Sequence, residues 1–329
     1  MKNAFFGAAT SVAVMLLAVT AAWAGEAQEQ TLSLADGTVV FSGGGGLLGL
    51  QADEYVYLAP GSSNTVSHLI WQSVSPMLTG AMDVKLPEGW TFSANADVAG
   101  LGRGYMEDYD WFGPNFISFD PNLWTHRSQS PNTGLDWYFK GSILVGRDLA
   151  IDNKTKVNIN GGLQYTDARW TAAGGTFIYS DIDVGDGCGF RGCTGTFADT
   201  PGITYHQQLP ALVAGADFST ETGDWTWGGS AHAGLIFGAH TTDNHWLREL
   251  NIFDGLGAAP LLSVSANADY KLSKKTSFVL SGSVQKIFTA RADAYYDYHD
   301  GVTDSFDAPD RNGSSLLSAS LSASFKGSF

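Results

Sequence analysis

Apolar and polar residues alternate along about ten segments of this chain, each long enough to be a tilted membrane-spanning strand. The last segment shows the pattern most clearly, because its apolar side chains share one face while serines and Lys326 occupy the other. A strand with lipid on one side and a polar interior on the other produces this alternation. The segments cover 39–58, 66–86, 90–106, 135–149, 156–169, 204–218, 225–238, 261–272, 277–288 and 315–329.

The first residues have the pattern of an export signal. A lysine near the start is followed by a mostly apolar stretch at 5–19, and Ala22 and Ala24 fit a small-x-small cleavage site. A membrane anchor is the alternative, but the apolar core is shorter than the roughly 20 residues of a spanning helix and no stop-transfer pattern follows. We therefore expect residues 1–24 to be a signal peptide and residues 25–329 to form a single domain.

No comparable apolar run follows this signal, which limits the ways in which the rest of the chain can meet a membrane. It either is soluble or crosses as a closed barrel, because the backbone polar groups must be satisfied inside lipid. The 40 glycines, 10 tryptophans, 12 tyrosines and 19 phenylalanines, with only 16% charged residues, favour twisted strands with aromatic girdles. The predicted fold class is all-β: a transmembrane antiparallel up-and-down β-barrel of about ten strands with long extracellular loops.

The connections between the segments alternate in length, and this indicates which end of the barrel faces outward. Tight turns with Gly, Asp, Asn or Lys alternate with connections that are mostly long. Transmembrane barrels place short turns in the periplasm and longer loops outside. The long connections are therefore expected at the extracellular end. The tight turns lie at 87–89, 151–155, 221–224 and 273–275, and the other connections at 61–64, 107–134, 170–203, 240–260 and 289–314.

The chain is acidic, with 33 Asp and Glu against 18 Lys and Arg and a formal net charge of −15. Such a surface repels the phosphates of nucleic acid and attracts cationic groups. We therefore expect no nucleic acid partner. Any substrate bound to this surface is expected to be cationic.

Two acidic motifs occur where a predicted strand runs into a long connection. Asp108 and Asp110 share one face of an extended chain, and Asp243 and His245 share another. If the strands close into a barrel, both faces can point inward, and two carboxylates opposite a carboxylate-paired imidazole could hold and deprotonate a water. The alternatives are a solvated loop edge or a calcium-binding fragment for the Asp pair, and a chance neighbour for the histidine. His232 and His240, on one strand or its edge, have spacing that would also suit a metal, but no matched cluster supports that.

Cys188 and Cys193 bracket Gly-Phe-Arg-Gly in a predicted loop. In an exported protein this proximity indicates a small disulfide-closed loop. A redox or metal pair is the alternative, but no other Cys or His lies at ligand spacing from the two.

Several stretches of the chain together match a known pattern, namely Glu54 to Ala59, Leu69, Trp71, Met106 to Trp111, Trp124, Thr125, Ser128, Pro131, Gly174, Gly175, Ile178 to Ser180, and Asp243 to His245. With these residues the chain resembles the omptins, a family of outer-membrane aspartyl proteases of Gram-negative bacteria. The resemblance implies a ten-stranded barrel with an Asp pair and an Asp-His pair across an extracellular groove. It implies that His245, supported by Asp243, activates a water shared with Asp108 while Asp110 assists, without an acyl-enzyme and without a metal. Ser128 matches a serine to which we assign at most a supporting role.

The resemblance also implies that lipopolysaccharide bound to the outer wall is needed as an activator. Tyr165, Asp167 and Arg169 look like the family's lipid-contacting pattern, with Asp where Glu is usual, and all three share a face. An arginine there could pair with a lipid phosphate. The alternative is a salt bridge between Arg169 and Asp167. Further basic residues of the family are replaced here by 206–208, His-Gln-Gln, so the lipid contact is expected to be weaker or differently built.

Specificity is where the chain departs from the family pattern. Glu54 matches an acidic position that the family uses beside basic substrate residues, and Met106 lines the same pocket. At a second position where the family has an acid, this chain has Thr241. At another acidic position of the family, near the groove, it has His126. Losing one charged partner costs about 1–3 kcal/mol of preference. Cleavage beside basic residues remains the expected activity.

The sequence therefore predicts an endopeptidase of the outer membrane of a Gram-negative bacterium, with its site facing outside. The main competing hypothesis is a catalytically inactive barrel that acts as an adhesin or structural protein. A lipid hydrolase lacks a convincing Ser-His arrangement, and about ten strands leave too narrow a lumen for a porin.

Overall fold

The computed structural model describes residues 38–113, 115–180 and 188–329, so the predicted signal peptide at 1–24 lies outside the described residues. Strands make up most of the described chain, and its only helices are two single-turn 3-10 helices. The elements are β1 Thr38–Tyr57, β2 Thr65–Lys85, η1 Pro87–Gly89, β3 Trp90–Ala99, β4 Gly102–Asp110, β5 His126–Ala150, β6 Thr155–Ala173, β7 Thr176–Tyr179, β8 Cys193–Thr196, β9 Pro201–Thr222, β10 Trp225–Ile236, β11 Ala239–His245, η2 Trp246–Arg248, β12 Leu250–Leu256, β13 Pro260–Lys271, β14 Thr276–Tyr298 and β15 Phe306–Ser328.

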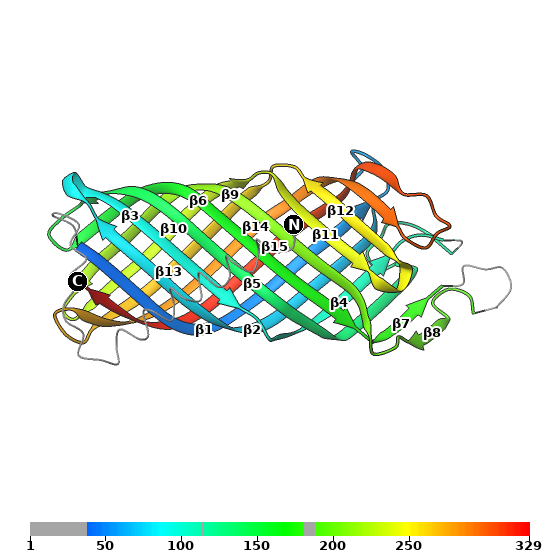
Figure 1. Ribbon diagram of the computed structural model, residues 1–329, viewed down its shortest axis with the longest axis horizontal. Helices are drawn as coiled ribbons and strands as arrows, with labels where there is room; N and C mark the ends of the chain where they lie inside the picture. The colour runs from blue at the N-terminus through cyan, green and yellow to red at the C-terminus, as the bar shows by residue number, and fades with distance from the viewer. Residues whose placement is uncertain (1–37, 114, 181–187) are drawn as a thin grey trace.

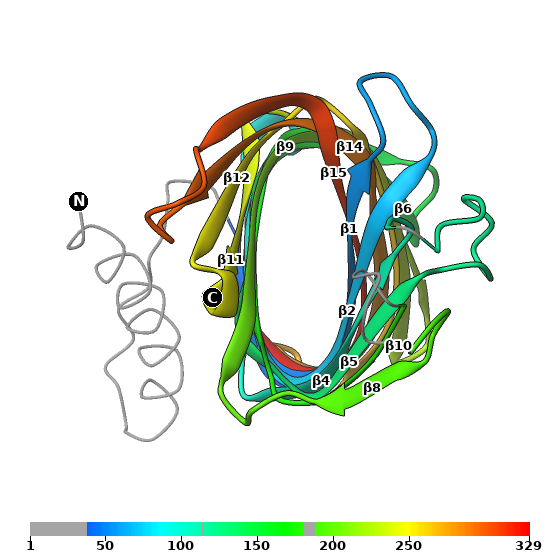
Figure 2. The ribbon, with the colours of Figure 1, turned by 90° about the vertical axis from the view of Figure 1, so that its right-hand side faces the viewer.

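The strands form one closed antiparallel ring (Figure 1). Three pairs continue one another along the wall, namely β3 with β4, β10 with β11, and β12 with β13, while β7 and β8 form a hairpin that extends from β5. With each continued pair taken as one strand, the ring has ten, and β15 closes it by pairing with β1. Seen end-on, the ring is oval, with β11 in one wall and β1 in the opposite wall (Figure 2). The predicted fold class is confirmed.

The sequence pattern predicts a single strand over 90–106, but the structure divides it at 100–101. Leu101 adopts φ 59° and is 94% exposed, so this short stretch leaves the ladder. Ser75 Oγ of β2 donates a hydrogen bond of 2.7 Å to the Gly100 carbonyl in place of a backbone partner. A Cβ at Gly102 would lie 2.9 Å from the Ser75 side chain, so glycine allows β4 to resume pairing directly beyond the break.

The outer wall has an apolar band that ends below the candidate site. Leu47, Val74 and Leu317 are exposed on β1, β2 and β15. Toward the outer rim they give way to Gln51 and Gln72, which are joined by a 3.2 Å hydrogen bond. Lipid chains contact the apolar band, so the strand ends beyond these two glutamines lie outside the membrane. Among the described residues, no helix is long and apolar enough to span a membrane.

The lumen below the acidic motifs is filled by large side chains that join opposite walls. Trp71 of β2 stacks on Tyr205 of β9 with ring centroids 5.7 Å apart. The Trp170 indole donates to Ser73 Oγ over 3.0 Å, and the Tyr205 hydroxyl lies 2.7 Å from Ser314 Oγ. These side chains form a packed floor under the outer mouth of the barrel.

At the outer end the strands run further than the alternation predicts. β14 and β15 leave only 299–305 as the connection between them, within the predicted loop 289–314. The predicted loop 240–260 contains β11, η2 and β12. These extensions stand above the apolar band, where no lipid requires apolar side chains on the outer face. The outer face can therefore be polar, as at Asp293 of β14, while Ala290, Ala292 and Ala294 on the inner face are buried. This reverses the alternation found in the membrane-spanning part.

Candidate active site

Asp108 and Asp110 lie on the inner face of β4, close to its outer end, and both are buried. β4 pairs with β2 so that Asp108 stands opposite Leu69 and Asp110 opposite Ser67. The Ser67 hydroxyl donates to Asp108 Oδ1 over 3.4 Å, and Ser128 stands opposite Asp108 on β5. Burial raises the pKa of Asp108, and burial together with the Asp108 charge raises the pKa of Asp110 well above its usual value. One proton can therefore be held by this pair.

Asp243 and His245 are two residues apart on β11 and both side chains are buried. His245 Nε2 lies 2.6 Å from Asp243 Oδ2, a short charge-assisted distance. When Nε2 carries the hydrogen donated to Asp243, Nδ1 is the nitrogen with a free lone pair. Asp243 is 1% exposed, and its second oxygen, Oδ1, has no hydrogen-bond partner among the described residues.

The two pairs come from strands that are not neighbours in the ring, yet they act on each other electrostatically. The positive form of His245 lowers the pKa of Asp108, while the Asp243 charge raises it, both weaker effects than burial. β4 and β11 are separated by β5, β6 and β9 on the shorter path round the ring. The structure thus places the four predicted side chains at one end of the lumen, facing each other above the packed floor.

Glu54 and Met106 lie beside these pairs. Glu54 is on the inner face of β1, is 2% exposed, and stands level with Leu69 of β2. The Asp243 carboxyl and the Trp71 indole are within reach of its carboxyl, but Glu54 Oε2 has no hydrogen-bond partner of good geometry among the described residues. Burial, then the charges of the neighbouring acids, raise the pKa of Glu54 well above its usual value. Met106 is buried and stands opposite Trp71 in the β2–β4 register.

Two further charged residues, which no sequence motif indicated, lie at this site. Arg248, in η2, lowers the pKa of Asp108 and of Asp110 through its positive charge. It follows His245 by three residues, and that proximity was the only available signal. Asp254 of β12 is buried on the inner face opposite Thr241. No sequence spacing relates it to the other acids, because the contact depends on strand pairing.

The histidines considered as a metal pair are not brought together. His232 Nε2 of β10 lies 2.8 Å from Asn160 Oδ1 and 3.8 Å from Asp217. His240 of β11 is exposed on the outer face. Among the described residues, no three His, Cys, Asp or Glu side chains are arranged to hold a metal ion.

Tyr165, Asp167 and Arg169 lie on β6, but the alternative salt bridge between Arg169 and Asp167 is wrong. Asp167 is already engaged: its Oδ1 lies 2.6 Å from the Trp137 indole nitrogen and 2.8 Å from His206 Nε2, and its Oδ2 accepts from the Tyr165 hydroxyl at 3.1 Å. Arg169 instead pairs with Asp136 of β5 at 3.3 Å and covers the Trp137 ring at 4.9 Å. The register explains this choice, because β5 and β6 shift between Leu135 and Trp137.

Cys188 and Cys193 are joined by a disulfide next to the β7–β8 hairpin. Between them, the Arg191 guanidinium lies 3.6 Å from the centre of the Trp124 ring and its Nε donates to the Trp124 carbonyl over 2.8 Å. Arg191 therefore holds the disulfide loop against the connection between β4 and β5. Beside it, His126 is buried and its Nδ1 lies 2.9 Å from Thr125 Oγ1.

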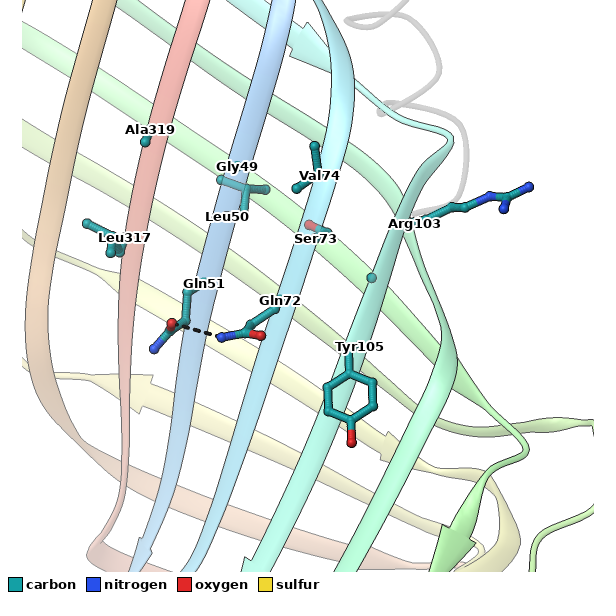
Figure 3. A pocket seen from close by; sticks show the side chains of 11 residues that line it. Gly49, Leu50, Gln51, Gln72, Ser73, Val74, Arg103, Tyr105, Leu317 and Ala319 are labelled. Carbon is teal, nitrogen blue, oxygen red and sulfur yellow. Dashed lines mark hydrogen bonds between the residues drawn. The ribbon is translucent and has the colours of Figure 1, made fainter.

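A shallow hollow lies on the outer wall, separate from the inward-facing acids (Figure 3). Gly49, Gly104 and Ala319 provide little or no side chain there, and the Gln51–Gln72 hydrogen bond crosses it. The hollow spans β15, β1, β2 and β4 at the upper edge of the apolar band. Its position faces lipid and not the lumen.

Sequence comparison finds similar proteins among bacterial proteases. The model of the Omptin family matches residues 36–326. Protease 7 of Escherichia coli O157:H7 is 25% identical over 265 residues, which are 79% of this chain and 81% of that protein. Outer membrane protease OmpP of Escherichia coli strain K12 is 26% identical over 265 residues, with the same shares of 79% and 81%.

Structural comparison gives the same relationship at the level of the fold. The crystal structure of outer membrane protease OmpT from Escherichia coli aligns with a TM-score of 0.80 and 22% identity, covering 92% of this chain and 100% of that one. The family model spans nearly all of the described residues, including every strand of the ring. This chain belongs to the Omptin family.

Proposed function

We propose that this protein is an endopeptidase that hydrolyses exposed peptide bonds beside basic residues, using a water activated by His245 and Asp243. It is a protein of the outer membrane of a Gram-negative bacterium. The observation that carries the proposal is the meeting of the Asp108–Asp110 pair with the Asp243–His245 pair above the lumen floor. The relatives named as proteases support the reaction class.

In the proposed reaction the nucleophile is water. His245 Nδ1 takes a proton from the water as its oxygen attacks the peptide carbonyl carbon, and Asp243 stabilises the resulting imidazolium. The raised pKa values of Asp108 and Asp110 allow the pair to hold one proton, which can be donated in a hydrogen bond to the water or to the substrate carbonyl. The imidazolium then returns its proton to the leaving amine as the C–N bond breaks.

Cationic substrates are proposed because the inner face at this end is rich in acids. Glu54 is buried next to Asp243, and Met106 lies beside it, so a side chain bound there would flank the bond under attack. A buried carboxylate without a counter-ion is unfavourable, and a substrate arginine or lysine would supply that counter-ion.

Lipopolysaccharide is proposed as an activator that binds at Tyr165, Asp167 and Arg169. Asp136 and Trp137 hold the Arg169 side chain on the outer wall, while part of it stays exposed. A guanidinium held in this way can pair with a phosphate in two parallel hydrogen bonds.

The test is turnover by the refolded protein without residues 1–24, in the presence of lipopolysaccharide. The substrate is an internally quenched peptide with paired basic residues. Cleavage should continue with a chelator or a serine-directed inhibitor and should be lost in His245→Ala. His240→Ala is the matched control, because His240 lies on the same strand but points outward. If His245→Ala cleaves normally, the site assignment is wrong. If the folded unmodified protein cleaves nothing, the inactive-barrel alternative is favoured.

A further inference from the structure

Asp254 is a buried acid on β12, and its neighbour on β11 is Thr241, which carries no charge. Asp254 is 3% exposed on the inner face and stands opposite Thr241 in the β11–β12 register. The Thr241 hydroxyl donates to its Oδ2 over 2.7 Å, and the Asn312 amide of β15 donates to its Oδ1 over 2.8 Å. Two donors from two different strands therefore fix the orientation of this carboxylate.

Glu54 approaches the same region from β1. The charges of Asp254 and Asp243 act on its carboxyl, and its buried Oε2 lacks a hydrogen-bond partner among the described residues. Gln207 of β9 stands opposite Thr241 on the side away from Asp254, and its fully buried Oε1 also lacks a partner. Unsatisfied acceptors thus come from two separate strands, β1 and β9, in the neighbourhood of Asp254 and Thr241.

This group of acceptors has no cation of its own. None of the ion pairs among the described residues includes Glu54 or Asp254. Burying a charged carboxylate without a counter-ion costs roughly several kcal/mol, and Glu54 avoids that cost by holding a proton, as its raised pKa indicates. A cation that enters the pocket would take the place of that proton. A structural role for Asp254 alone, bracing Thr241 and Asn312, could be filled by a neutral amide. The unpaired acids are better explained by a cation that arrives from outside.

We propose that Asp254 is a specificity-determining residue, which acts with Glu54 in binding the cationic side chain of a peptide substrate next to the bond being cleaved. This rests on the proposed peptidase function and assigns the second acid of the pocket to β12, not to β11. A guanidinium suits the pocket because it carries several N–H groups, and Glu54 Oε2 and Gln207 Oε1 are acceptors without a partner among the described residues. The contact between Glu54 and Asp243 places the pocket beside the Asp-His pair.

Protonation of the pocket gives a second line of support. Burial raises the pKa of Asp254 to about 6, with a smaller contribution from the Asp243 charge, while the Thr241 and Asn312 hydrogen bonds lower it. Asp254 is therefore charged above that pH and neutral below it. Selectivity for a cation should accordingly weaken in acid. The other titratable groups that face Asp254 are Glu54 of β1, Tyr205 of β9, Asp243 of β11 and Tyr296 of β14.

The test compares two peptides that differ at one residue, arginine or its neutral isostere citrulline. Binding is measured first on His245→Ala protein, so that the result does not depend on turnover. The arginine peptide should bind at least tenfold more tightly. Asp254→Asn in this background should cut that ratio at least tenfold and leave citrulline binding within about threefold. Asp297→Asn is the control, because it removes one acid from the outer part of β14 away from the pocket.

Several outcomes decide the proposal. Equal affinity for the two peptides in the His245→Ala background would overturn the pocket even if the protein is a peptidase. A ratio lowered by Glu54→Gln but not by Asp254→Asn would leave Asp254 as a brace only. If Asp254→Asn does not fold, Asp254→Ser and the pH dependence of the ratio in the unsubstituted pocket provide the same test. A ratio that stays constant from pH 7.5 to pH 5 would contradict the role of Asp254, because burial raises its pKa to about 6.

Discussion

Replacing Asp243 by asparagine tests the proposed activation of water most directly. Asp243→Asn keeps the size of the side chain, and its amide oxygen can still accept the hydrogen of His245 Nε2, which now lies 2.6 Å from Asp243 Oδ2. The lost contribution is the charge that stabilises the imidazolium. A hydrogen bond to a charged group contributes about 1.5–3 kcal/mol. Since about 1.4 kcal/mol corresponds to a tenfold change in rate, kcat should fall about 10- to 150-fold.

The same substitution should not weaken the barrel. Asp243 is 1% exposed, its Oδ1 has no partner among the described residues, and Glu54 and Asp254 lie close by. Removing a buried charge from this acidic group should leave the urea midpoint of unfolding unchanged or raise it. The assay measures kcat for the quenched peptide and the urea midpoint on one preparation, with Asp297→Asn as control. A folded variant whose kcat stays within twofold of the unmodified protein would refute the proposed support of His245 by Asp243.

Three further outcomes are expected. Burial and the neighbouring Asp108 carboxylate raise the pKa of Asp110, so the folded protein keeps a proton that the unfolded chain releases. The free energy of unfolding should therefore fall as the pH rises from the ordinary pKa of an aspartate toward the raised pKa of Asp110. Asp110→Asn should reduce this fall, as measured by urea midpoints across pH. Reducing the Cys188–Cys193 disulfide should speed amide hydrogen exchange at 189–196, while the heat-modifiable gel mobility of the barrel stays unchanged. Equal exchange rates before and after reduction would contradict this. Arg169→Gln should raise the lipopolysaccharide concentration for half-maximal activity about tenfold, which a lipid titration of cleavage measures.

The membrane-spanning part of the fold could be predicted because lipid imposes a pattern on the sequence. The polar and apolar faces of 315–329 correspond to opposite sides of β15, where Leu321 and Phe325 are exposed and Ser318 and Ser324 are buried. Above the apolar band this constraint disappears, and β14 continues with Ala290, Ala292 and Ala294 buried and polar residues such as Asp293 on the outer face. The break at Leu101 was also missed, because it depends on a hydroxyl from the neighbouring strand.

The candidate site could be predicted only as far as spacing along one strand reaches. Two residues of separation put Asp243 and His245 on one face of β11, and the structure has them in contact. The contacts of Glu54 with Asp243, and of Asp254 with Thr241, depend on register and on closure of the ring. Neither quantity can be read from one strand alone. The alternative in which Arg169 pairs with Asp167 was wrong for the same reason, because a register shift between β5 and β6 brings Asp136 to Arg169 instead.

The packed floor under the site should determine how well the two walls are held apart. Trp71 is fully buried and stacks on Tyr205 of the opposite wall, with the rings 5.7 Å apart and nearly parallel at 16°. Trp71→Ala would leave a cavity between β2 and β9 and should lower the free energy of unfolding by about 3–5 kcal/mol. Trp71→Phe keeps an aromatic ring in contact with Tyr205 and should lose much less.

The effect on catalysis separates two ways in which this barrel could position its acids. If the floor sets the distance between the walls, Trp71→Ala should lower kcat by a larger factor than Trp71→Phe, because the Asp108 and His245 side chains stand on opposite sides of the mouth above it. A small misplacement of reacting groups can lower a rate about 100-fold. If the backbone ladder alone sets the distance, the two variants should have equal kcat despite their different stabilities. Measuring kcat and the urea midpoint on both variants decides between them, and equal kcat values would refute a positioning role for the floor.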